Sequence, residues 1–354
     1  MRVTIKVQRY LPDTDAGSNG AGPERRIDEF TVEMERDDAT FLDVLDRVKD
    51  EQDGTLTYRK SCRSAICGSC AMRVDGHAHL VCKTQVKPFV DRGETPLVSP
   101  MGNMPPIKDL VVDMSLFWEK IKAIKPYLMP DEYREAPEKE RIVAEEKMQE
   151  VYREANCIMC GACVSECNSW TVNEKFLGPA ALAKAFRFAG DARDSRTSER
   201  LEMYSEPNGI WDCTRCYHCN QKCPKDVRPR DAIAKIGAAA YNQGIQEDKG
   251  AKHAKAFLHS VKRGGMLNET RLVAFTNGMV GAGLDTPFAV RMTLRGKANP
   301  FEILVHHKID NLESVRSLIK HTHEEPIGTQ DPPPPKSSTR GGHTVTLPFN
   351  TPFD

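Results

Sequence analysis

The N-terminal part of the chain alternates apolar and polar positions as a small sheet with one helix does. Residues 2–8 alternate strictly, which predicts a strand with one buried face, and residues 27–34 alternate less cleanly, which predicts its hairpin partner. A helix is expected to begin after Thr40, because the next apolar residues share one helical face: Phe41, Val44, Leu45 and Val48. Residues 71–82 predict a second hairpin, with Asp75-Gly76 at its turn. These elements together predict an α+β domain.

Helical spacing replaces this alternation further along the chain. Residues 107–125 carry apolar side chains at helical steps, which predicts one amphipathic helix. The apolar positions of that stripe are Leu110, Met114, Phe117, Ile121 and Ile124. Residues 138–155 are rich in Glu and Lys and predict a solvated helix. Further helices are expected from Pro179 and over residues 231–241, so the middle of the chain is predicted to be α-helical.

The C-terminal third has no cysteine and a less regular pattern. Residues 251–262 and 309–319 predict helices, whereas glycines and prolines interrupt the apolar segments of residues 266–305. The tail from Gln330 is polar and rich in proline, so we expect it to be disordered or to lie along a partner. No group of acid, base and nucleophile is apparent in this third, which favours a mostly helical docking extension over a catalytic domain.

Composition excludes some classes of protein. The 354 residues include 50 Lys and Arg and 50 Asp and Glu, so a globally basic nucleic-acid-binding protein is disfavoured. The first residues lack the charged segment and apolar core of a signal peptide, and no apolar stretch approaches the ~18–20 residues of a membrane span. We therefore expect a protein of a reducing compartment, without a transmembrane helix of its own.

The 12 cysteines fall into three groups of four. The first group is Cys62, Cys67, Cys70 and Cys82. Its C-x4-C-x2-C spacing with a distant fourth cysteine is the plant-type pattern for a [2Fe-2S] cluster. Gly68 lacks a Cβ and would let the backbone approach the cluster closely, and the 71–82 hairpin returns the chain to Cys82. The pattern predicts a [2Fe-2S] ferredoxin domain of the β-grasp type.

The other two groups each read C-x2-C-x2-C-x3-C, the spacing of bacterial ferredoxins that bind cubane clusters. One run extends from Cys157 to Cys167, and the other extends from Cys213 to Cys223 and is followed by Pro224. In such folds three closely spaced thiolates bind one cluster, and the fourth cysteine of the run ligates the other cluster. The expected ligand sets are therefore crossed: Cys157, Cys160 and Cys163 with Cys223, and Cys213, Cys216 and Cys219 with Cys167.

Two other uses of these cysteines are disfavoured. Disulfides do not suit C-x2-C neighbours in a chain without signs of secretion. Structural zinc also uses C-x2-C pairs, but two pairs per ion suffice, and the third thiolate and the C-x3-C-P sequence would have no role. Iron–sulfur clusters are the better interpretation.

The motifs make the chain resemble the iron–sulfur subunit of succinate dehydrogenase and fumarate reductase. The run Ser-Cys-Arg-Ser-Ala-Ile-Cys-Gly-Ser-Cys-Ala-Met at 61–72 resembles the first-cluster signature of that family, and residues 107–113 resemble the start of its linker helix. Residues 176–180 and 191–196 resemble the helix between its cubane motifs and the turn that follows. The resemblance covers residues 1–242.

That resemblance implies a role in electron transfer, with no catalytic residue in this chain. A separate flavoprotein would oxidise succinate or reduce fumarate at FAD, and electrons would pass through the three clusters here toward a membrane quinone. The chain would lie peripherally at the cytoplasmic face of the membrane, held by the flavoprotein and by membrane-anchor or acceptor subunits.

The terminal cluster departs from the quinone-linked members of that family. Those members hold a [3Fe-4S] cluster there, because an aliphatic residue stands where this chain has Cys216. Cys216 restores the fourth thiolate, so we expect a second [4Fe-4S] cluster, with [3Fe-4S] as the alternative if Cys216 turns away. The four-iron form is expected to have the lower reduction potential, which suits a menaquinone-type quinone.

The surroundings of that cluster also differ from the family pattern. Quinone-linked members place a His directly after the first cysteine of the second run, where this chain has Thr214. They also place a Trp a few residues after the first run, at a greater distance from it than Trp170. His218, beside Cys219, is interpreted either as an exposed loop residue or as a hydrogen-bond partner near the acceptor. Trp170, Thr214 and His218 are therefore the candidate acceptor-side neighbours.

Two alternative functions remain beside this one. The chain also resembles the iron–sulfur subunits of thiol-linked fumarate reductases and heterodisulfide-reductase-like enzymes, whose Cys-rich acceptor module would have to be another subunit. An electron-transfer subunit of a 2-hydroxy acid or glycerol-phosphate oxidase complex is disfavoured, because such subunits usually lack the [2Fe-2S] domain.

The sequence predicts five segments in all. Their expected bounds are 1–105 for the [2Fe-2S] domain, 106–145 for linker helices, 146–242 for the two-cluster domain, 243–325 for the docking extension and 326–354 for the tail. The expected partner of the docking extension is the membrane or acceptor subunit first and the flavoprotein second.

Overall fold

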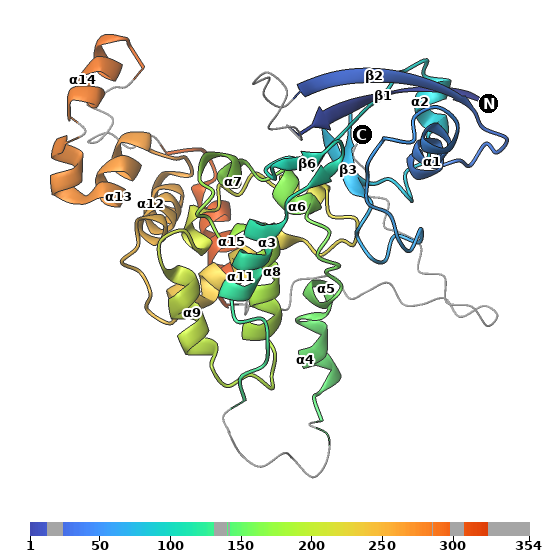
Figure 1. Ribbon diagram of the computed structural model, residues 1–354. Helices are drawn as coiled ribbons and strands as arrows, with labels where there is room; N and C mark the ends of the chain where they lie inside the picture. Colours follow the sequence, from blue (N-terminus) through green and yellow to red (C-terminus); the bar gives the residue numbers. More distant parts are fainter. Residues whose placement is uncertain (13–23, 131–139, 141, 285, 298–307, 325–354) are drawn as a thin grey trace.

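The computed structural model describes residues 1–12, 24–130, 140, 142–284, 286–297 and 308–324. The predicted tail at 326–354 lies outside the described residues. A sheet-containing N-terminal part and a helical part lie side by side, and the helices α13 and α14 lie farthest from the sheet (Figure 1). The α+β class expected from the sequence is confirmed.

A five-stranded mixed sheet with the order β2-β1-β5-β3-β4 forms the N-terminal part. Its strands are β1 (Arg2–Leu11), β2 (Glu24–Glu33), β3 (Ala71–Val74), β4 (His77–Leu80) and β5 (Leu97–Ser99). Two antiparallel hairpins flank β5, which runs parallel to β1 and antiparallel to β3. Both hairpins were expected, and Asp75 and Gly76 form the turn of the second with positive φ angles.

Helix α1 (Phe41–Glu51) buries the apolar face that the sequence indicated. Thr40 caps it through a capping box: its hydroxyl accepts from the Asp43 backbone N–H, and the Asp43 carboxylate accepts from the Thr40 N–H. The side chains of α1 share a core with the inward-facing positions of β1. A short helix, α2 (Lys87–Asp91), follows the second hairpin and leads to β5.

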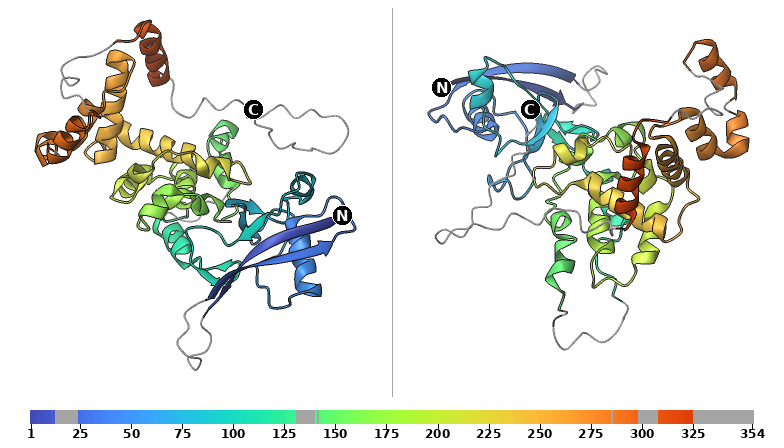
Figure 2. Two further views of the ribbon diagram at one scale, coloured as in Figure 1. Left: turned by 90° about the horizontal axis from the view of Figure 1, so that it is seen from above. Right: turned by 180° about the vertical axis from the view of Figure 1, so that it is seen from behind.

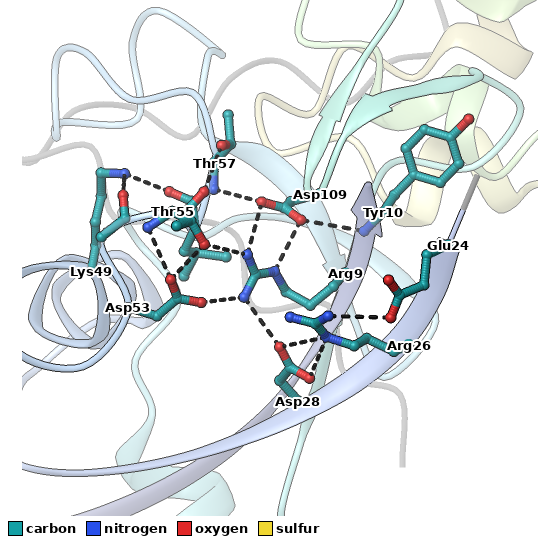
Figure 3. A network of polar contacts seen from close by, with 12 residues as sticks. Arg9, Tyr10, Glu24, Arg26, Asp28, Lys49, Asp53, Thr55, Thr57 and Asp109 are labelled. Atoms are coloured by element: carbon teal, nitrogen blue, oxygen red, sulfur yellow. Dashed lines mark hydrogen bonds and ion pairs between the residues drawn. The ribbon is translucent and has the colours of Figure 1, made fainter. Parts of the chain in front are cut away.

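Arg9 occupies the last inward-facing position of β1, after Val3, Ile5 and Val7, and is fully buried. Three carboxylates surround its guanidinium, from Asp28, Asp53 and Asp109 (Figure 3). Burial alone would lower the pKa of Arg9, but its hydrogen bonds to Asp109 and Asp53 raise it overall. Asp109 also accepts from the backbone N–H of Thr57 at 2.9 Å, so this network ties β1 to two later segments.

We expect Asp109→Ala to destabilise the sheet domain by about 3–5 kcal/mol, because it leaves the buried Arg9 charge without its main partner. The measurement is the urea midpoint of sheet unfolding, followed by far-UV circular dichroism. Arg36→Ala is the matched control, since it removes an ion pair with Asp38 whose side chains are exposed, and its midpoint should hardly move. Equal shifts in the two variants would contradict a structural role for the Arg9 network.

The prediction of one helix over residues 107–125 is wrong for the first half of that range. Two short strands stand there, β6 (Pro106–Lys108) and β7 (Val111–Val112), and the helix α3 covers only Ser115–Ala123. Asp109 explains the difference, because its carboxylate is held by Arg9 and its backbone has a φ of 45°. The N–H of Asp109 donates to the Tyr10 carbonyl at 2.8 Å, outside any helix.

The helical part is built from short helices around the later cysteines. These are α4 (Glu145–Gln149), α5 (Tyr152–Ala155), α6 (Ala162–Ser165), α7 (Asn168–Val172), α8 (Gly178–Ala189), α9 (Thr197–Ser205), the 3-10 turn η1 (Ile210–Asp212), α10 (His218–Gln221) and α11 (Pro229–Asn242). The single solvated helix expected over 138–155 is instead broken between α4 and α5, where Val151 is fully buried. The helices expected from Pro179 and near Asp231 are confirmed as α8 and α11, which pack together.

The C-terminal helices continue from this part of the molecule. They are α12 (Lys249–Gly264), α13 (Glu269–Leu284), α14 (Thr286–Leu294) and α15 (Leu312–Glu324). Helix α12 packs against α13 and α15, which the two views of Figure 2 show from above and behind. Within the described residues, no helix combines the length and the apolar character needed to cross a membrane.

Candidate metal centres

The N-terminal centre is defined as Cys62, Cys67, Cys70 and Cys82. Its first three cysteines lie on the loop between α1 and β3, and Cys82 lies in the turn just after β4. Cys67 interacts with Cys62, and Cys70 interacts with Cys82 and Cys67, so the structure brings the four thiols together. The backbone N–H groups of Ser64, Ile66 and Cys67 donate to the Cys62 sulfur at 3.3–3.4 Å. Such N–H donors favour a charged sulfur, as a cluster ligand must be.

Gly68 packs this loop against the first cubane run. A Cβ at Gly68 would lie 2.8 Å from Cys160 Cβ and 3.2 Å from the Ile158 carbonyl oxygen. Its φ of +75° is also one that side chains rarely adopt. The sequence predicted a close approach of the backbone here, and the neighbour found is the loop of the next centre.

The middle centre, defined as Cys157, Cys160, Cys163 and Cys223, lines one depression of the surface. Cys160 and Cys163 both interact electrostatically with Cys223, although Cys223 belongs to the other run. The backbone N–H of Val227 donates to the Cys223 sulfur at 3.3 Å. The structure therefore places Cys223 with the thiols of the first run, in the crossed arrangement expected from the spacing.

The terminal centre, defined as Cys167, Cys213, Cys216 and Cys219, repeats this arrangement. Cys167 interacts with Cys213 and Cys216, and its sulfur accepts from the Trp170 N–H at 3.4 Å at the start of α7. Cys219 interacts with Cys213, Cys167 and Cys216 in turn. Cys216 thus lies within electrostatic reach of the other three thiols.

The two cubane runs share one backbone conformation. The residues before and after the second cysteine have positive φ in both: Met159 (56°) and Gly161 (80°) in the first run, and Arg215 (57°) and Tyr217 (65°) in the second. This repeated geometry turns three successive thiols to one side of each loop. Cys160 and Cys216 occupy the same position in it, so nothing in the local backbone sets Cys216 apart from a cysteine of the first run.

Burial changes the acidity of most of these thiols. It raises the pKa of Cys70 and Cys219 to about 12 and that of Cys160 and Cys167 to about 11. It also raises the pKa of Cys163 well above its ordinary value. Cys67 is the contrasting case, because hydrogen bonds from the Ser69 side chain and from the backbone lower its pKa to about 6. The buried thiols hold their protons unless a positively charged group binds them, which is what iron supplies.

The number and chemistry of the thiols suit iron–sulfur clusters. Among the described residues, no three Cys, His, Asp or Glu side chains are arranged to hold one metal ion. Each of the three centres instead offers four thiols, which is the ligand set of an iron–sulfur cluster.

The predicted acceptor-side neighbours have different surroundings. Trp170 is 2% exposed, its ring stacks under the Lys120 ammonium, and its indole N–H has no hydrogen-bond partner among the described residues. Thr214 is exposed, and its backbone N–H donates to Ser169 Oγ at 3.2 Å. His218 is exposed at the start of α10, in agreement with the first of its two interpretations.

Sequence reasoning missed the residues that join the N-terminal part to the segment between the middle and terminal centres. The Arg73 guanidinium donates to the Glu166 carboxylate at 3.0 Å and to the Ser165 carbonyl at 3.1 Å. The Asn103 amide donates to the carbonyls of Val164 (2.8 Å) and Cys167 (3.0 Å). These partners are at least 61 residues apart in sequence, and no local pattern signals such contacts.

Comparisons with known proteins agree with the three centres. A family model described as a 2Fe-2S iron–sulfur cluster binding domain matches residues 4–119, and one described as a 4Fe-4S dicluster domain matches residues 154–227. The first match contains the whole N-terminal centre, and the second contains every cysteine of the other two centres.

The chain is also similar to curated proteins. It is 35% identical over 79% of its length to the 8-methylmenaquinol:fumarate reductase iron–sulfur subunit of Wolinella succinogenes, covering 88% of that protein. It is 37% identical to the succinate dehydrogenase iron–sulfur subunit of Paracoccus denitrificans (66% of this chain, 85% of that one). It is 38% identical to the fumarate reductase iron–sulfur subunit of Escherichia coli (65% and 89%).

A solved structure shows the same fold. A chain of the Mycobacterium smegmatis Sdh1 complex in the apo form matches with a TM-score of 0.59 at 24% identity, over 70% of this chain and 98% of that one.

Proposed function

This chain belongs to the family of iron–sulfur subunits of succinate dehydrogenases and fumarate reductases and transfers electrons within such a complex. We propose that its twelve cysteines hold three clusters for this electron transfer. The N-terminal centre would hold [2Fe-2S], and the middle and terminal centres would each hold [4Fe-4S]. When bound, these clusters supply one-electron transfer, while the chain itself contributes no catalytic residue.

The observation that carries this proposal is the contact between successive centres. Gly68 of the N-terminal centre lies against Cys160 of the middle centre, and Cys163 of the middle centre interacts with Cys219 of the terminal centre. The order of the centres along the chain is thus also their order in space. Backbone N–H groups directed at Cys62, Cys167 and Cys223 would stabilise the thiolates, and Cys70, Cys163, Cys167 and Cys219 are buried.

The two ends of this row would face different partners. At the N-terminal centre Cys67 is exposed, and the side chain of its neighbour Ile66 is 60% exposed, which suits contact with an FAD-containing flavoprotein subunit. The terminal centre would face a membrane-anchor or acceptor subunit, with the chain held peripherally at the cytoplasmic face. The five segment bounds drawn from the sequence stay a prediction.

The electron acceptor or donor at the terminal centre is proposed to be a quinone of the menaquinone type. The similarity to the 8-methylmenaquinol:fumarate reductase subunit extends over 79% of this chain, more than the match to either of the other two relatives. Cys216 supports the same choice, because a fourth thiolate retains the fourth iron and favours a lower potential.

We expect the complex that co-purifies with this chain to reduce fumarate when it is given a reduced naphthoquinone analogue of menaquinol. The rate should be at least about tenfold higher than with a benzoquinol of high potential. The measurement is anaerobic quinol oxidation, with fumarate omitted in the control reaction. Turnover that depends on a thiol donor, with neither quinol active, would instead support the thiol-linked alternative.

A further inference from the structure

Helices α12, α13 and α14 form an arm that projects from the helical part of the molecule. Figures 1 and 2 show this arm on the side away from the five-stranded sheet, with α14 outermost in each view. Helix α13 is kinked at Gly278, where the backbone has φ 67° and ψ 179°, and this kink precedes α14. Among the described residues, the outer end of the arm lies away from the rest of the helical part.

Large apolar side chains of this arm are exposed. The most exposed are Phe275 (62%), Phe288 (64%) and Leu294 (82%), and Val290 and Met266 are each about half exposed. In α14 every residue from Thr286 to Arg291 is exposed, so no face of the helix's first six residues is covered. A run of exposed aromatic and aliphatic side chains on adjacent helices is typical of an interaction surface.

The arm is also strongly basic. Residues 249–297 contain nine Lys and Arg but only Glu269 and Asp285 as acids, whereas the whole chain is neutral with 50 residues of each sign. Arg291 lies in α14, and Arg295 follows its last residue, with its N–H donating to the Arg291 carbonyl at 3.2 Å. Helical spacing over these residues places both arginines between Phe288 on one side and Leu294 on the other. Apolar side chains that flank basic ones in this way suit a surface with an apolar interior and negatively charged head groups.

The arm begins beside the terminal centre. Gly250, near the start of α12, lies so close to η1 that a Cβ there would be 2.6 Å from Trp211 Cβ. Trp211 is two residues before Cys213 of the terminal centre. The base of the arm therefore adjoins the terminal centre.

We propose that α12–α14 bind the surface of a membrane that contains anionic phospholipids. The excess of basic residues complements anionic head groups, each Lys or Arg near such a surface adding about fivefold to binding. The exposed apolar side chains would enter the boundary between head groups and acyl chains. Among the described residues no helix is suited to span a bilayer, and α14 has nine residues, so the arm would lie on the membrane rather than cross it.

The test is co-flotation of the full chain, with its clusters reconstituted, on vesicles of phosphatidylcholine alone or mixed with phosphatidylglycerol. We expect binding to the mixed vesicles that falls as salt rises and that is at least about tenfold weaker without phosphatidylglycerol. Phe288→Asp and the pair Arg291→Glu/Arg295→Glu should each weaken binding about tenfold or more.

Matched controls carry the same changes at exposed positions of the N-terminal part. Ile27→Asp replaces an apolar side chain that is 58% exposed, and Arg36→Glu/Arg92→Glu reverses two exposed charges; both should bind vesicles as the unmodified chain does. Iron content and cluster EPR should match in all variants, which separates this proposal from that of the three clusters.

Three results would overturn the proposal. One is that the unmodified chain does not bind the mixed vesicles. Another is that the arm variants and the control variants lose vesicle binding to the same extent. The third is that Phe288→Asp leaves vesicle binding intact but releases a protein subunit from the complex in detergent, which would assign the arm to a protein partner.

Discussion

Cys223→Ser is expected to remove the cluster of the middle centre while the terminal centre, which contains the rest of the Cys213–Cys223 run, keeps its own. The thiols of Cys160 and Cys163 both interact with Cys223, and the sulfur of Cys223 also accepts from the Val227 N–H. Serine offers a hard oxygen in place of the thiolate, so the cluster held by Cys157, Cys160 and Cys163 should lose iron. We expect a loss of up to about four iron atoms per chain.

Cys219→Ser is the matched variant, four residues earlier in the same run. Its thiol interacts with Cys167, Cys213 and Cys216, so it should damage the terminal centre and spare the middle one. Mössbauer and EPR spectra of the two variants after anaerobic purification should therefore differ in which cluster is missing. If both variants lost the same cluster, the crossed ligation would be wrong.

Cys216→Val is expected to convert the terminal cluster from [4Fe-4S] to [3Fe-4S]. A cubane loses one iron readily at a corner without a thiolate, and Cys216 lies within reach of Cys167, Cys213 and Cys219. The oxidised variant should show a three-iron EPR signal of about one spin per chain, which the unmodified protein should lack. The reduction potential of the terminal centre should rise with it.

Thr214→Val is the neighbouring control for that change. It alters an exposed side chain next to Cys213 and removes no thiol, so the cluster should keep its fourth iron. An unmodified protein that already gives a stoichiometric three-iron signal, unchanged by Cys216→Val, would show that Cys216 is not a ligand.

The patterns that the sequence revealed well are local ones. The capping box of Thr40 and Asp43, the turn at Asp75-Gly76 and the spacing of the cysteine runs each depend on residues close together in the chain. The crossed placement of Cys223 could also be predicted, since the C-x3-C step turns the fourth thiol away from the first three. The helices α8, α11 and α12 were likewise expected, α8 from the proline at its start, Pro179.

The features that could not be predicted depend on residues far apart in the chain. The apolar stripe of residues 107–125 follows helical spacing, but Asp109 is bound by Arg9, one hundred residues earlier, and this contact holds β6 and β7 out of a helix. An arginine at an inward strand position does not indicate which carboxylates will surround it. The contacts of Arg73 and Asn103 with residues 164–167 fix the middle and terminal centres against the sheet domain. They too join residues far apart in the chain.

The most direct test of the three-cluster account is the iron and acid-labile sulfide content of the full chain after anaerobic purification, with zinc measured in the same sample. One [2Fe-2S] and two [4Fe-4S] clusters on twelve thiols require about ten iron and about ten sulfide per chain, with zinc near zero. About nine iron with ten sulfide would mean that the terminal cluster has three irons, contrary to the role proposed for Cys216. Two or three zinc ions per chain without sulfide would contradict the account as a whole.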